Sequence, residues 1–440
     1  MHHFFKGQFF DFEVVRILGV AVYGGSDIAE VLEAVGQIKD GDAESWGRAW
    51  KTQAERAEAL AEAAMKAGHH PIARQAFLRA SNYTRASGYM LCGDGPDRPH
   101  PRQLEVCERV ASLFGKAAAL FDDCEFHRLE IPYKEGGLTL PAYLYLPPHD
   151  KRLPGKIPIL ISSGGADALQ EELFYMHPSA GPSLGYAVLT FEGPGQGLTL
   201  RRHNLKMRPD WEAVVGVVLS FLEQLSETRP ELELDTSRIG IAGASLGGYF
   251  ALRSAVDPRI KACVALDPLW SMWDFATEHV SPTFIGAWDR GWLGDGFVDS
   301  VIGLAMRFSF QMRWEVAAGG TFFGLRSPAS IMQEMKRYSL ALPGGGNHLE
   351  HVRCPVLVSG ASDSLYLKEN HHTMRVFNAL TNVAEADKTL WLASNPGEGS
   401  LQAKMGALRL ANQRTFQFLD LALGIKRGMA TTAESKISAD

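Results

Sequence analysis

The sequence predicts an α/β fold: a mostly parallel, twisted sheet flanked by helices, with a helical cap. Short apolar runs, such as residues 157–161 and 186–191, alternate with helical stretches such as 211–225, which is the rhythm of βαβ units. Helical periodicity also fills much of the chain before residue 125. At 440 residues the chain exceeds what one hydrophobic core usually supports, so a core with a sizeable cap is expected.

The order of these patterns predicts where the parts begin and end. Residues 1–125 are expected to form a helical N-terminal cap domain, with consecutive amphipathic helices from about residue 28 to 121. A hairpin signal around Glu135-Gly-Gly then opens the first part of the core, residues 126–268.

The second half of the chain follows the same logic. Residues 269–350 are dense in Trp, Phe and Met and too long for a bare connection, so they are predicted to be a second helical cap inserted into the core. Residues 351–426 complete the core, ending in a helix over 405–423. The polar tail, residues 427–440, is expected to be disordered.

Composition narrows the range of partners. Lys and Arg number 44 against 50 Asp and Glu, so the net charge of -6 offers no footprint for nucleic acid or an anionic membrane, and a small-molecule substrate is expected. The five cysteines are an odd number without a CxxC pair, which signals neither a disulfide framework nor a metal site. A reducing, cytoplasmic compartment is therefore expected. No apolar stretch is long enough to predict a membrane span.

The strongest chemical signal is Gly243-Ala-Ser245-Leu-Gly247, a GxSxG motif between an apolar run and a helical stretch. In the α/β-hydrolase fold this motif places a serine on a strained strand-to-helix turn, where small neighbours avoid clashes and the hydroxyl projects above the sheet. An ordinary tight turn with a helix-capping serine is the alternative. We interpret Ser245 as a nucleophile.

The same fold supplies an oxyanion hole from two backbone amides. One belongs to the residue after the nucleophile, here Leu246, and the other to the loop over residues 162–167, where Gly165 or Ala166 is the expected donor. Asp167 follows in this loop. It is a candidate for holding or protonating a leaving group, and a solvated helix N-cap is an equal alternative.

The rest of the usual triad is incomplete. Asp363, on the turn after the apolar run 355–359, occupies the expected place of the triad acid. A histidine should follow the next strand, but none occurs after His372. The loop that should carry it contains Glu398 and Gln402, and a glutamine is not a useful base at neutral pH.

Other groups are weaker candidates for the base. They are Glu398, in the same loop, or a histidine arriving from a cap, such as His177, His279 or His348, although each alone is more often a solvated or structural residue. The last two histidines, His371 and His372, are predicted to be surface positions on a helix over residues 368–380.

Several motifs together resemble the FrsA-like branch of α/β hydrolases, which includes 2,6-dihydroxypseudooxynicotine hydrolase and the fungal yellowish-green pigment hydrolases. They are Glu192-Gly-Pro-Gly-Gln-Gly197, Gly243-Ala-Ser-Leu-Gly-Gly248, the helical N-terminal domain and the ending over residues 411–420. The resemblance covers about residues 10–423. It implies a cleft between core and cap, no metal or organic cofactor, and a carbonyl-bearing substrate, often a polyketide; it also makes a homodimer plausible. The chain departs from the branch where a histidine is expected, since Gln402-Ala-Lys precedes Met405.

Two enzymatic functions follow from this combination. The first is a serine-centred hydrolase that cuts a C–C or ester bond of a polyketide-like molecule in secondary metabolism. The second is a non-hydrolytic cyclase, condensing enzyme or lyase that polarises a carbonyl in the same oxyanion pocket. A pseudoenzyme that only binds a ligand is the third hypothesis, favoured if Ser245 is unreactive.

Overall fold

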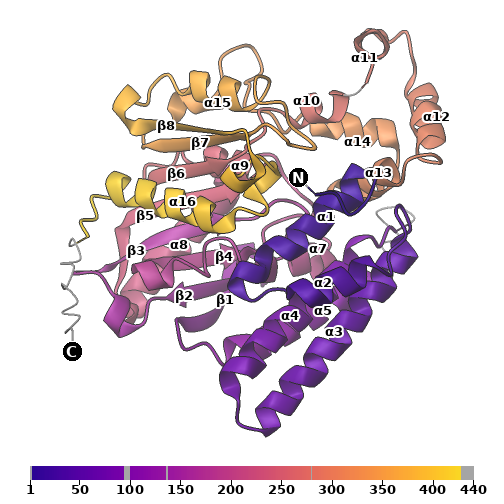
Figure 1. The fold of residues 1–440 in the computed structure, drawn as a ribbon. Coiled ribbons are helices and arrows are strands. Elements are labelled where there is room, and N and C mark those ends of the chain that lie inside the picture. The colour runs from indigo at the N-terminus through magenta and orange to yellow at the C-terminus, as the bar shows by residue number, and fades with distance from the viewer. Residues whose placement is uncertain (1, 94–99, 135–136, 279, 428–440) are drawn as a thin grey trace, which may run out of the picture.

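The computed structural model describes residues 2–93, 100–134, 137–278 and 280–427, and an eight-stranded sheet runs through its centre (Figure 1). The strand order is β1-β2-β4-β3-β5-β6-β7-β8. Strand β2 is antiparallel to its neighbours β1 and β4, and all the remaining neighbouring pairs, from β4 to β8, are parallel. The predicted fold class is thereby confirmed. The strands are β1 (Glu125–Lys134), β2 (Leu138–Leu146), β3 (Ile157–Ser163), β4 (Ala187–Phe191), β5 (Leu234–Ala244), β6 (Ile260–Leu266), β7 (Val356–Ala361) and β8 (Lys388–Ala393).

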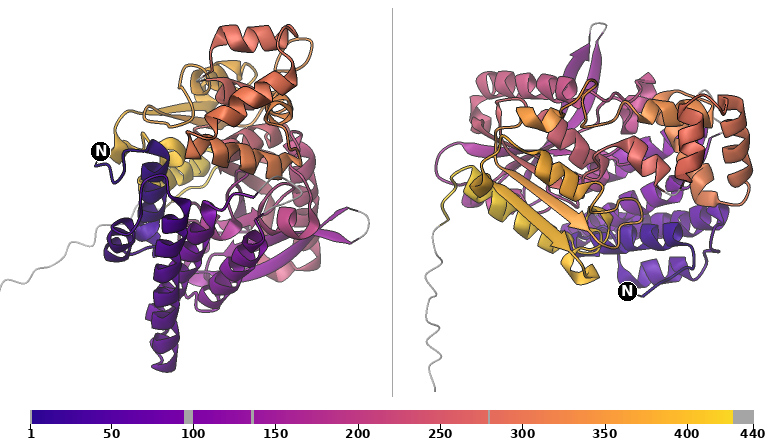
Figure 2. Two further views of the ribbon diagram at one scale, coloured as in Figure 1. Left: turned by 90° about the vertical axis from the view of Figure 1, so that its right-hand side faces the viewer. Right: turned by 90° about the horizontal axis from the view of Figure 1, so that it is seen from above.

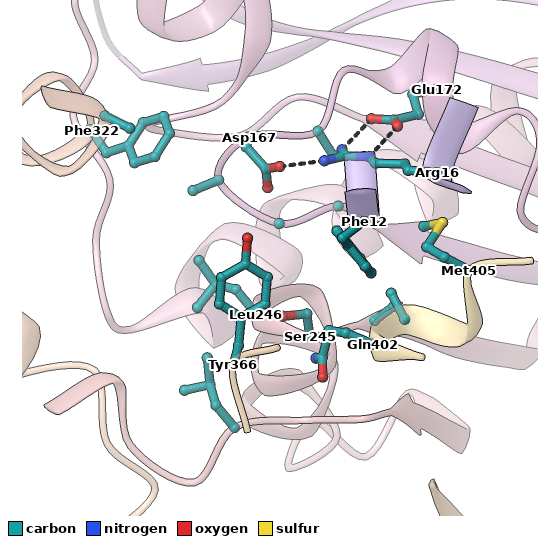
Figure 3. A pocket seen from close by; sticks show the side chains of 18 of the residues that line it. Phe12, Arg16, Asp167, Glu172, Ser245, Leu246, Phe322, Tyr366, Gln402 and Met405 are labelled. Carbon is teal, nitrogen blue, oxygen red and sulfur yellow. Dashed lines mark hydrogen bonds and ion pairs between the residues drawn. The ribbon is translucent and has the colours of Figure 1, made fainter. Parts of the chain in front are cut away.

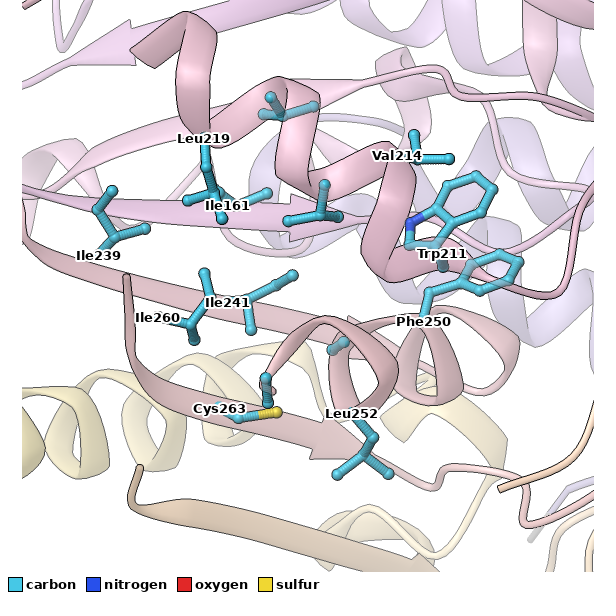
Figure 4. Packing of buried hydrophobic residues seen from close by; sticks show 14 of the residues in the cluster. Ile161, Trp211, Val214, Leu219, Ile239, Ile241, Phe250, Leu252, Ile260 and Cys263 are labelled. Atoms are coloured by element: carbon cyan, nitrogen blue, oxygen red, sulfur yellow. The ribbon is translucent and has the colours of Figure 1, made fainter. Parts of the chain in front are cut away.

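Alternating residues of the central strands build two separate cores, one on each face of the sheet. Ile159 and Ile161 of β3 face the cluster formed with α8 (Trp211–Thr228), α9 (Leu246–Ser254) and α15 (Thr373–Ala379), as Figure 4 shows for part of this cluster. Leu160, between them, belongs to the cluster around α16 (Leu408–Ala422) on the other face. This period of two is the geometry of a strand buried on both sides.

Two further groups of helices lie on one side of the sheet (Figures 1 and 2). The N-terminal group is α1 (Gln8–Gly19), α2 (Ile28–Val35), α3 (Ala43–Lys66), α4 (His70–Tyr89) and α5 (Arg102–Ala118). The second group, between β6 and β7, is α10 (Met272–Thr277), α11 (Pro282–Asp289), α12 (Asp295–Ala305), α13 (Phe310–Phe323) and α14 (Pro328–Met335). Two short helices, α6 (Gln170–Leu173) and α7 (Gly197–His203), complete the described elements longer than a 3-10 turn.

The N-terminal group is fixed to the core by aromatic packing. Phe114 of α5 stacks on Tyr143 of β2 with ring centroids 5.6 Å apart, and Tyr23, after α1, accepts a 2.9 Å hydrogen bond from Asn412 of α16. Helix α1 lies before residue 28, where the sequence predicts that the helices begin. The contacts of Phe114 and Tyr23 hold the N-terminal group against the core.

Some expectations fall on residues outside the described part of the chain. They are Glu135 and Gly136 of the hairpin signal, His279, and the tail from residue 428. Among the described helices, none is long and apolar enough to cross a membrane.

The turn between β5 and α9 tolerates no side chain at Gly243. A Cβ built there would lie 2.1 Å from the Gly247 carbonyl oxygen. We therefore expect Gly243→Ala to lower the free energy of unfolding by about 1–3 kcal/mol, measured by urea denaturation. Gly216→Ala in α8 is the control, because its Cβ would meet nothing nearer than 4.0 Å; it should raise stability by about 0.5–1 kcal/mol. Equal effects of the two substitutions would contradict the packing described.

Candidate active site

Ser245 sits on a strained turn that explains the GxSxG spacing. Its φ of 56° and ψ of -121° lie in a region that L residues rarely adopt, at a cost of about 1–3 kcal/mol. Its amide donates to the Leu266 carbonyl at 2.8 Å, which ties the turn to β6. A Cβ on Gly247 would lie 2.5 Å from the Ser163 carbonyl oxygen, so only glycine lets α9 approach β3. The serine is thereby held at the carboxyl ends of the strands.

A cavity of about 230 Å³ opens in front of Ser245 (Figure 3). Its walls come from α1, α4 and α13 on the cap side and from the loops after β3, β5, β6, β7 and β8 on the core side. Most lining side chains are apolar, so the cavity suits an apolar small molecule. The apolar walls include Phe12, Val20, Leu173, Met207, Leu269, Met272, Phe275, Trp314, Phe322, Phe323, Met335, Leu367, Met405 and Leu408.

The loop after β3 is oriented by Gln196, a residue of the Glu-Gly-Pro-Gly-Gln-Gly motif. The Gln196 side-chain amide donates to the carbonyl oxygens of Gly164 at 2.8 Å and Gly165 at 2.9 Å. In a trans peptide the N–H points away from the preceding C=O. The amides of Gly165 and Ala166 therefore point away from Gln196, and both residues line the cavity.

The two predicted oxyanion donors are neighbours. A Cβ built on Gly165 would lie 3.7 Å from the Leu246 Cβ and 3.8 Å from the Gly247 amide nitrogen. Leu246 is the first residue of α9 and also lines the cavity. The structure thus brings Ser245, Leu246, Gly165 and Ala166 together around one part of the cavity.

Gln402 is the polar side chain beside Ser245 in Figure 3, and it also lines the cavity. It is held in place on both sides: its Nε2 donates to the Asp267 carbonyl at 3.1 Å, and its Oε1 accepts from the Ser364 hydroxyl at 2.5 Å. Of the described residues that line the cavity, none is a histidine. Among the described residues, Ser245 therefore has no imidazole on the cavity wall to take its proton.

Asp363 and Glu398 lie apart from the cavity. Asp363 follows β7 as expected, but it is exposed, and its carboxylate accepts a 2.5 Å hydrogen bond from Ser400. Glu398 is also exposed, and it accepts from Asn395 at 3.0 Å. Neither is among the described residues lining the cavity. Asp363 contacts Ser400, in the loop that carries Gln402, and is not among the described residues that line the cavity with Ser245.

His177, His348 and His372 have partners elsewhere in the core, whereas His371 is exposed, as expected, and lies 3.2 Å from Glu278. His372 is fully buried, so the expected surface position is wrong; α15 begins only at Thr373, and the imidazole Nδ1 accepts from the Trp270 amide at 3.0 Å. Burial lowers the pKa of His372 to about 4. His177 is buried against the Ser162 hydroxyl, and burial lowers its pKa to about 4 as well. His348 contacts the Arg253 carbonyl.

A buried ion pair, which the sequence reasoning missed, fixes the loop after β8. Lys404 Nζ lies 2.8 Å from Asp267 Oδ1, and both side chains are fully buried. Lys404 also donates to the carbonyls of Gly360 and Gly399, at 2.8 and 3.0 Å. Burial lowers the pKa of Lys404 and raises that of Asp267, while their mutual attraction opposes both shifts. Lys404 lies two residues after Gln402, so this ion pair fixes the position of the glutamine.

A second polar group lies on the cap side of the cavity, around Arg16 of α1 (Figure 3). Arg16 binds Glu172 through Nε and Nη2, both at 2.6 Å, and Asp167 through Nη1 at 2.9 Å. Tyr89 of α4 donates to the same Asp167 oxygen at 2.9 Å. Glu13 of α1 lies 3.5 Å from Arg16 and lines the cavity too.

Asp167 is therefore not a solvated helix N-cap. The N-cap of the following helix α6 is Leu169. Burial acts to raise the pKa of Asp167, but the charge of Arg16 and the hydrogen bonds from Arg16 and Tyr89 outweigh it and lower the pKa below its usual value. Asp167 is a carboxylate at neutral pH, which argues against a role as proton donor.

The sequence did hold a signal for the Arg16 group. Charged residues at positions 13 and 16 interrupt the apolar face that Phe10, Val14 and Ile17 define, and all of these side chains are buried. A charged residue at a buried helical position requires a partner, which is a reason to look for one elsewhere in the chain. No group of three or more His, Cys, Asp or Glu able to hold a metal occurs among the described residues.

Comparisons with known proteins identify the family of the chain. The profile of the alpha/beta hydrolase family matches residues 159–396, and the chain belongs to that family. It is similar to Hydrolase ORFZ of Pyricularia oryzae (strain 70-15), 69% identical over 97% of this chain and 99% of that protein. It is also similar to Hydrolyase ccsE of Aspergillus clavatus, 55% identical over 97% and 99%. The chain is thus an enzyme of the hydrolase class.

A solved structure supports the fold alone. The crystal structure of the 2,6-dihydroxy-pseudo-oxynicotine hydrolase superimposes with a TM-score of 0.67 at 19% sequence identity, covering 93% of this chain and 97% of that one. The resemblance that the motifs predicted is confirmed by these findings.

The buried pair allows a stability test. Lys404→Met should lower the free energy of unfolding by about 3–5 kcal/mol, because it leaves the Asp267 charge buried without a partner. Adding Asp267→Asn to that variant should recover part of the loss. Lys51→Met is the control, since Lys51 and Glu55 form an exposed pair worth about 0–1 kcal/mol. Fully additive losses in a denaturation double-mutant cycle would contradict the pairing.

Proposed function

We propose that this chain is a serine-centred hydrolase that acts on a carbonyl group, at an ester or C–C bond, of an apolar, polyketide-like small molecule in secondary metabolism. The observation that carries the proposal is the position of Ser245, on a strained turn at the wall of an apolar cavity and next to the backbone amides of Gly165, Ala166 and Leu246. The fungal relatives named hydrolases support the reaction class.

In this mechanism Ser245 Oγ attacks the substrate carbonyl carbon and forms a C–O bond. The carbonyl π electrons move to the oxygen, where the amides of Leu246 and of Gly165 or Ala166 stabilise the negative charge. The bond to the leaving group then breaks, and the leaving group takes the proton from Oγ. Water hydrolyses the acyl-enzyme and frees Ser245.

The residues after β7 and β8 position this site. Asp363 keeps the place of the triad acid in the chain, and through Ser400 it fixes the loop that carries Gln402. Gln402 fills the place of the histidine without being able to accept a proton. The reaction therefore depends on oxyanion stabilisation and binding more than on a base.

One observation favours a second function. Both ends of the Gln402 side chain are engaged, and none of the described cavity-lining residues is a histidine. A cyclase or condensing enzyme needs no acyl-enzyme, because the same amides can polarise a carbonyl while the cavity holds the chain folded. Such an enzyme would keep its turnover without the Ser245 hydroxyl.

Two wider expectations remain part of the proposal. The cysteine usage suggests a cytoplasmic enzyme, and the family resemblance suggests a homodimer.

Ser245 and Gln402 provide the first test. Ser245→Ala should reduce hydrolysis of a medium-chain p-nitrophenyl ester to the background rate. Gln402→His should raise it roughly tenfold or more, because the new imidazole lies beside the serine. Initial rates by absorbance measure both. Full esterase activity in Ser245→Ala would contradict the proposed mechanism, and no gain in Gln402→His would show that this position is not the place of the missing base.

Gln196 provides a test of the oxyanion loop. Gln196→Met removes the two hydrogen bonds that turn the carbonyls of Gly164 and Gly165 away from the cavity. We expect kcat for the same ester to fall about a hundredfold, since one misplaced oxyanion donor typically has this effect. Gln170→Met is the matched control, because Gln170 is equally buried and its side-chain amide has no hydrogen-bond partner in the described chain. Equal losses in both variants would argue against the role of Gln196.

A further inference from the structure

The polar group around Arg16 holds more negative than positive charge. Glu13, Asp167 and Glu172 share two arginines, Arg16 and Arg85, the second of which lies 3.3 Å from Glu172. If all three carboxyls were ionised, this group would carry a net charge of -1, with Glu13, Glu172 and both arginines buried. Burying an uncompensated charge is expensive, and a carboxyl in that situation takes up a proton instead.

The hydrogen bonds identify which of the three carboxyl groups is protonated. Glu172 receives two 2.6 Å bonds from Arg16, and Asp167 receives 2.9 Å bonds from Arg16 and Tyr89. Both oxygens of Glu13 lie 3.5 Å from Arg16, too far for a strong bond. Glu13 is therefore the carboxyl whose negative charge is least stabilised.

The electrostatic surroundings agree. Burial raises the pKa of Glu13 to about 7, and the charges of Asp167 and Glu172 add to the rise while Arg16 and Arg85 oppose it. Other ionisable groups on the cavity wall come from other elements. They are Tyr89 of α4, Glu315 of α13 and Tyr366 after β7.

We propose that Glu13, in its neutral form, donates a hydrogen bond to a carbonyl oxygen of the substrate on the cap side of the cavity, away from Ser245. Glu13 lines the cavity, and little of its side chain is accessible, so a ligand that fills the cavity meets it with bulk water excluded. Arg16 already directs Nε, Nη1 and Nη2 at its partners, and Tyr89 donates to Asp167. The Glu13 proton remains as a donor for the ligand.

This inference rests on the proposed function, because it assumes a carbonyl-bearing substrate. It deepens that function by naming a second contact with the substrate. The substrate would carry two oxygen acceptors, one held by the amides near Ser245 and one by Glu13. An apolar chain with a single polar end would leave one of the two sites unmatched.

The test uses 2,8-nonanedione, an apolar chain with a ketone oxygen near each end, as the probe ligand, with affinity measured by calorimetry from about pH 6 to about pH 9. In the unchanged protein, affinity should fall above about pH 7 and approach a tenfold loss per pH unit, because ionised Glu13 repels the carbonyl oxygen. Glu13→Gln keeps a donor without titrating, so it should bind with no such fall. Absence of binding at pH 6, a pH-independent affinity, or the same fall in Glu13→Gln would each overturn the proposal.

A ligand-free measurement separates this inference from the proposed function. The raised pKa of Glu13 means that the folded state holds a proton that the unfolded state releases, so Glu13 favours folding at low pH and loses that effect as pH rises toward about 7. Melting temperatures of the protein and Glu13→Gln should differ little near pH 5, and the variant should be the more stable near pH 8. Glu55→Gln, at an exposed site, should show no such widening. An unchanged difference would contradict a protonated Glu13 even if ester hydrolysis through Ser245 is demonstrated.

Discussion

The ion pair of Arg16 with Glu172 joins the helical cap to the core, and the cavity depends on it. Arg16 belongs to α1, at the start of the chain, whereas Glu172 and Asp167 belong to the segment that follows β3. The same segment carries Gly165 and Ala166, which lie next to Ser245. One guanidinium therefore links the cap to the part of the core where the chemistry is proposed, and replacing it would leave two buried carboxyls, Glu13 and Glu172, and the half-buried Asp167 without this shared partner.

The core side of the site is rigid for a different reason. Ser245, Asp267 and Lys404 all adopt a positive φ, and none of them is a glycine. Such strain persists only where the surroundings over-determine it. Here the Ser245 amide is bound to β6, and the Lys404 ammonium is bound by Asp267 and two backbone carbonyls. Such rigidity keeps the amides beside Ser245 preorganised, so that they can stabilise a developing negative charge without moving.

The fold and the serine were predictable because their signals are local. The strand alternation, the GxSxG motif and the paired glycines after β3 each occupy a few consecutive residues, and the structure places Ser245, Leu246, Gly165 and Ala166 together. Gln402 was identified through the family resemblance, which places it before Met405 where a histidine is expected, and it does line the cavity. The missing histidine was plain from the sequence itself.

The parts that could not be predicted depend on contacts between distant segments. Arg16 meets Glu172, Gln196 meets Gly164, and Lys404 meets Asp267 only because the sheet order and the cap bring them together. His372 was expected on the surface because its helix was placed five residues too early; the structure begins α15 at Thr373 and turns the imidazole toward Trp270. Asp363 occupies the expected turn, yet its contact is Ser400.

The central claim is that Ser245 lies in an oxyanion pocket with no imidazole to activate it. Its most direct test is the rate at which a fluorophosphonate labels Ser245 between about pH 6 and about pH 9, followed by intact mass and peptide mapping. Without an imidazole base, labelling should be slow and should keep rising with pH across this range. Rapid labelling that levels off above about pH 7, as a titrating histidine produces, would contradict the account.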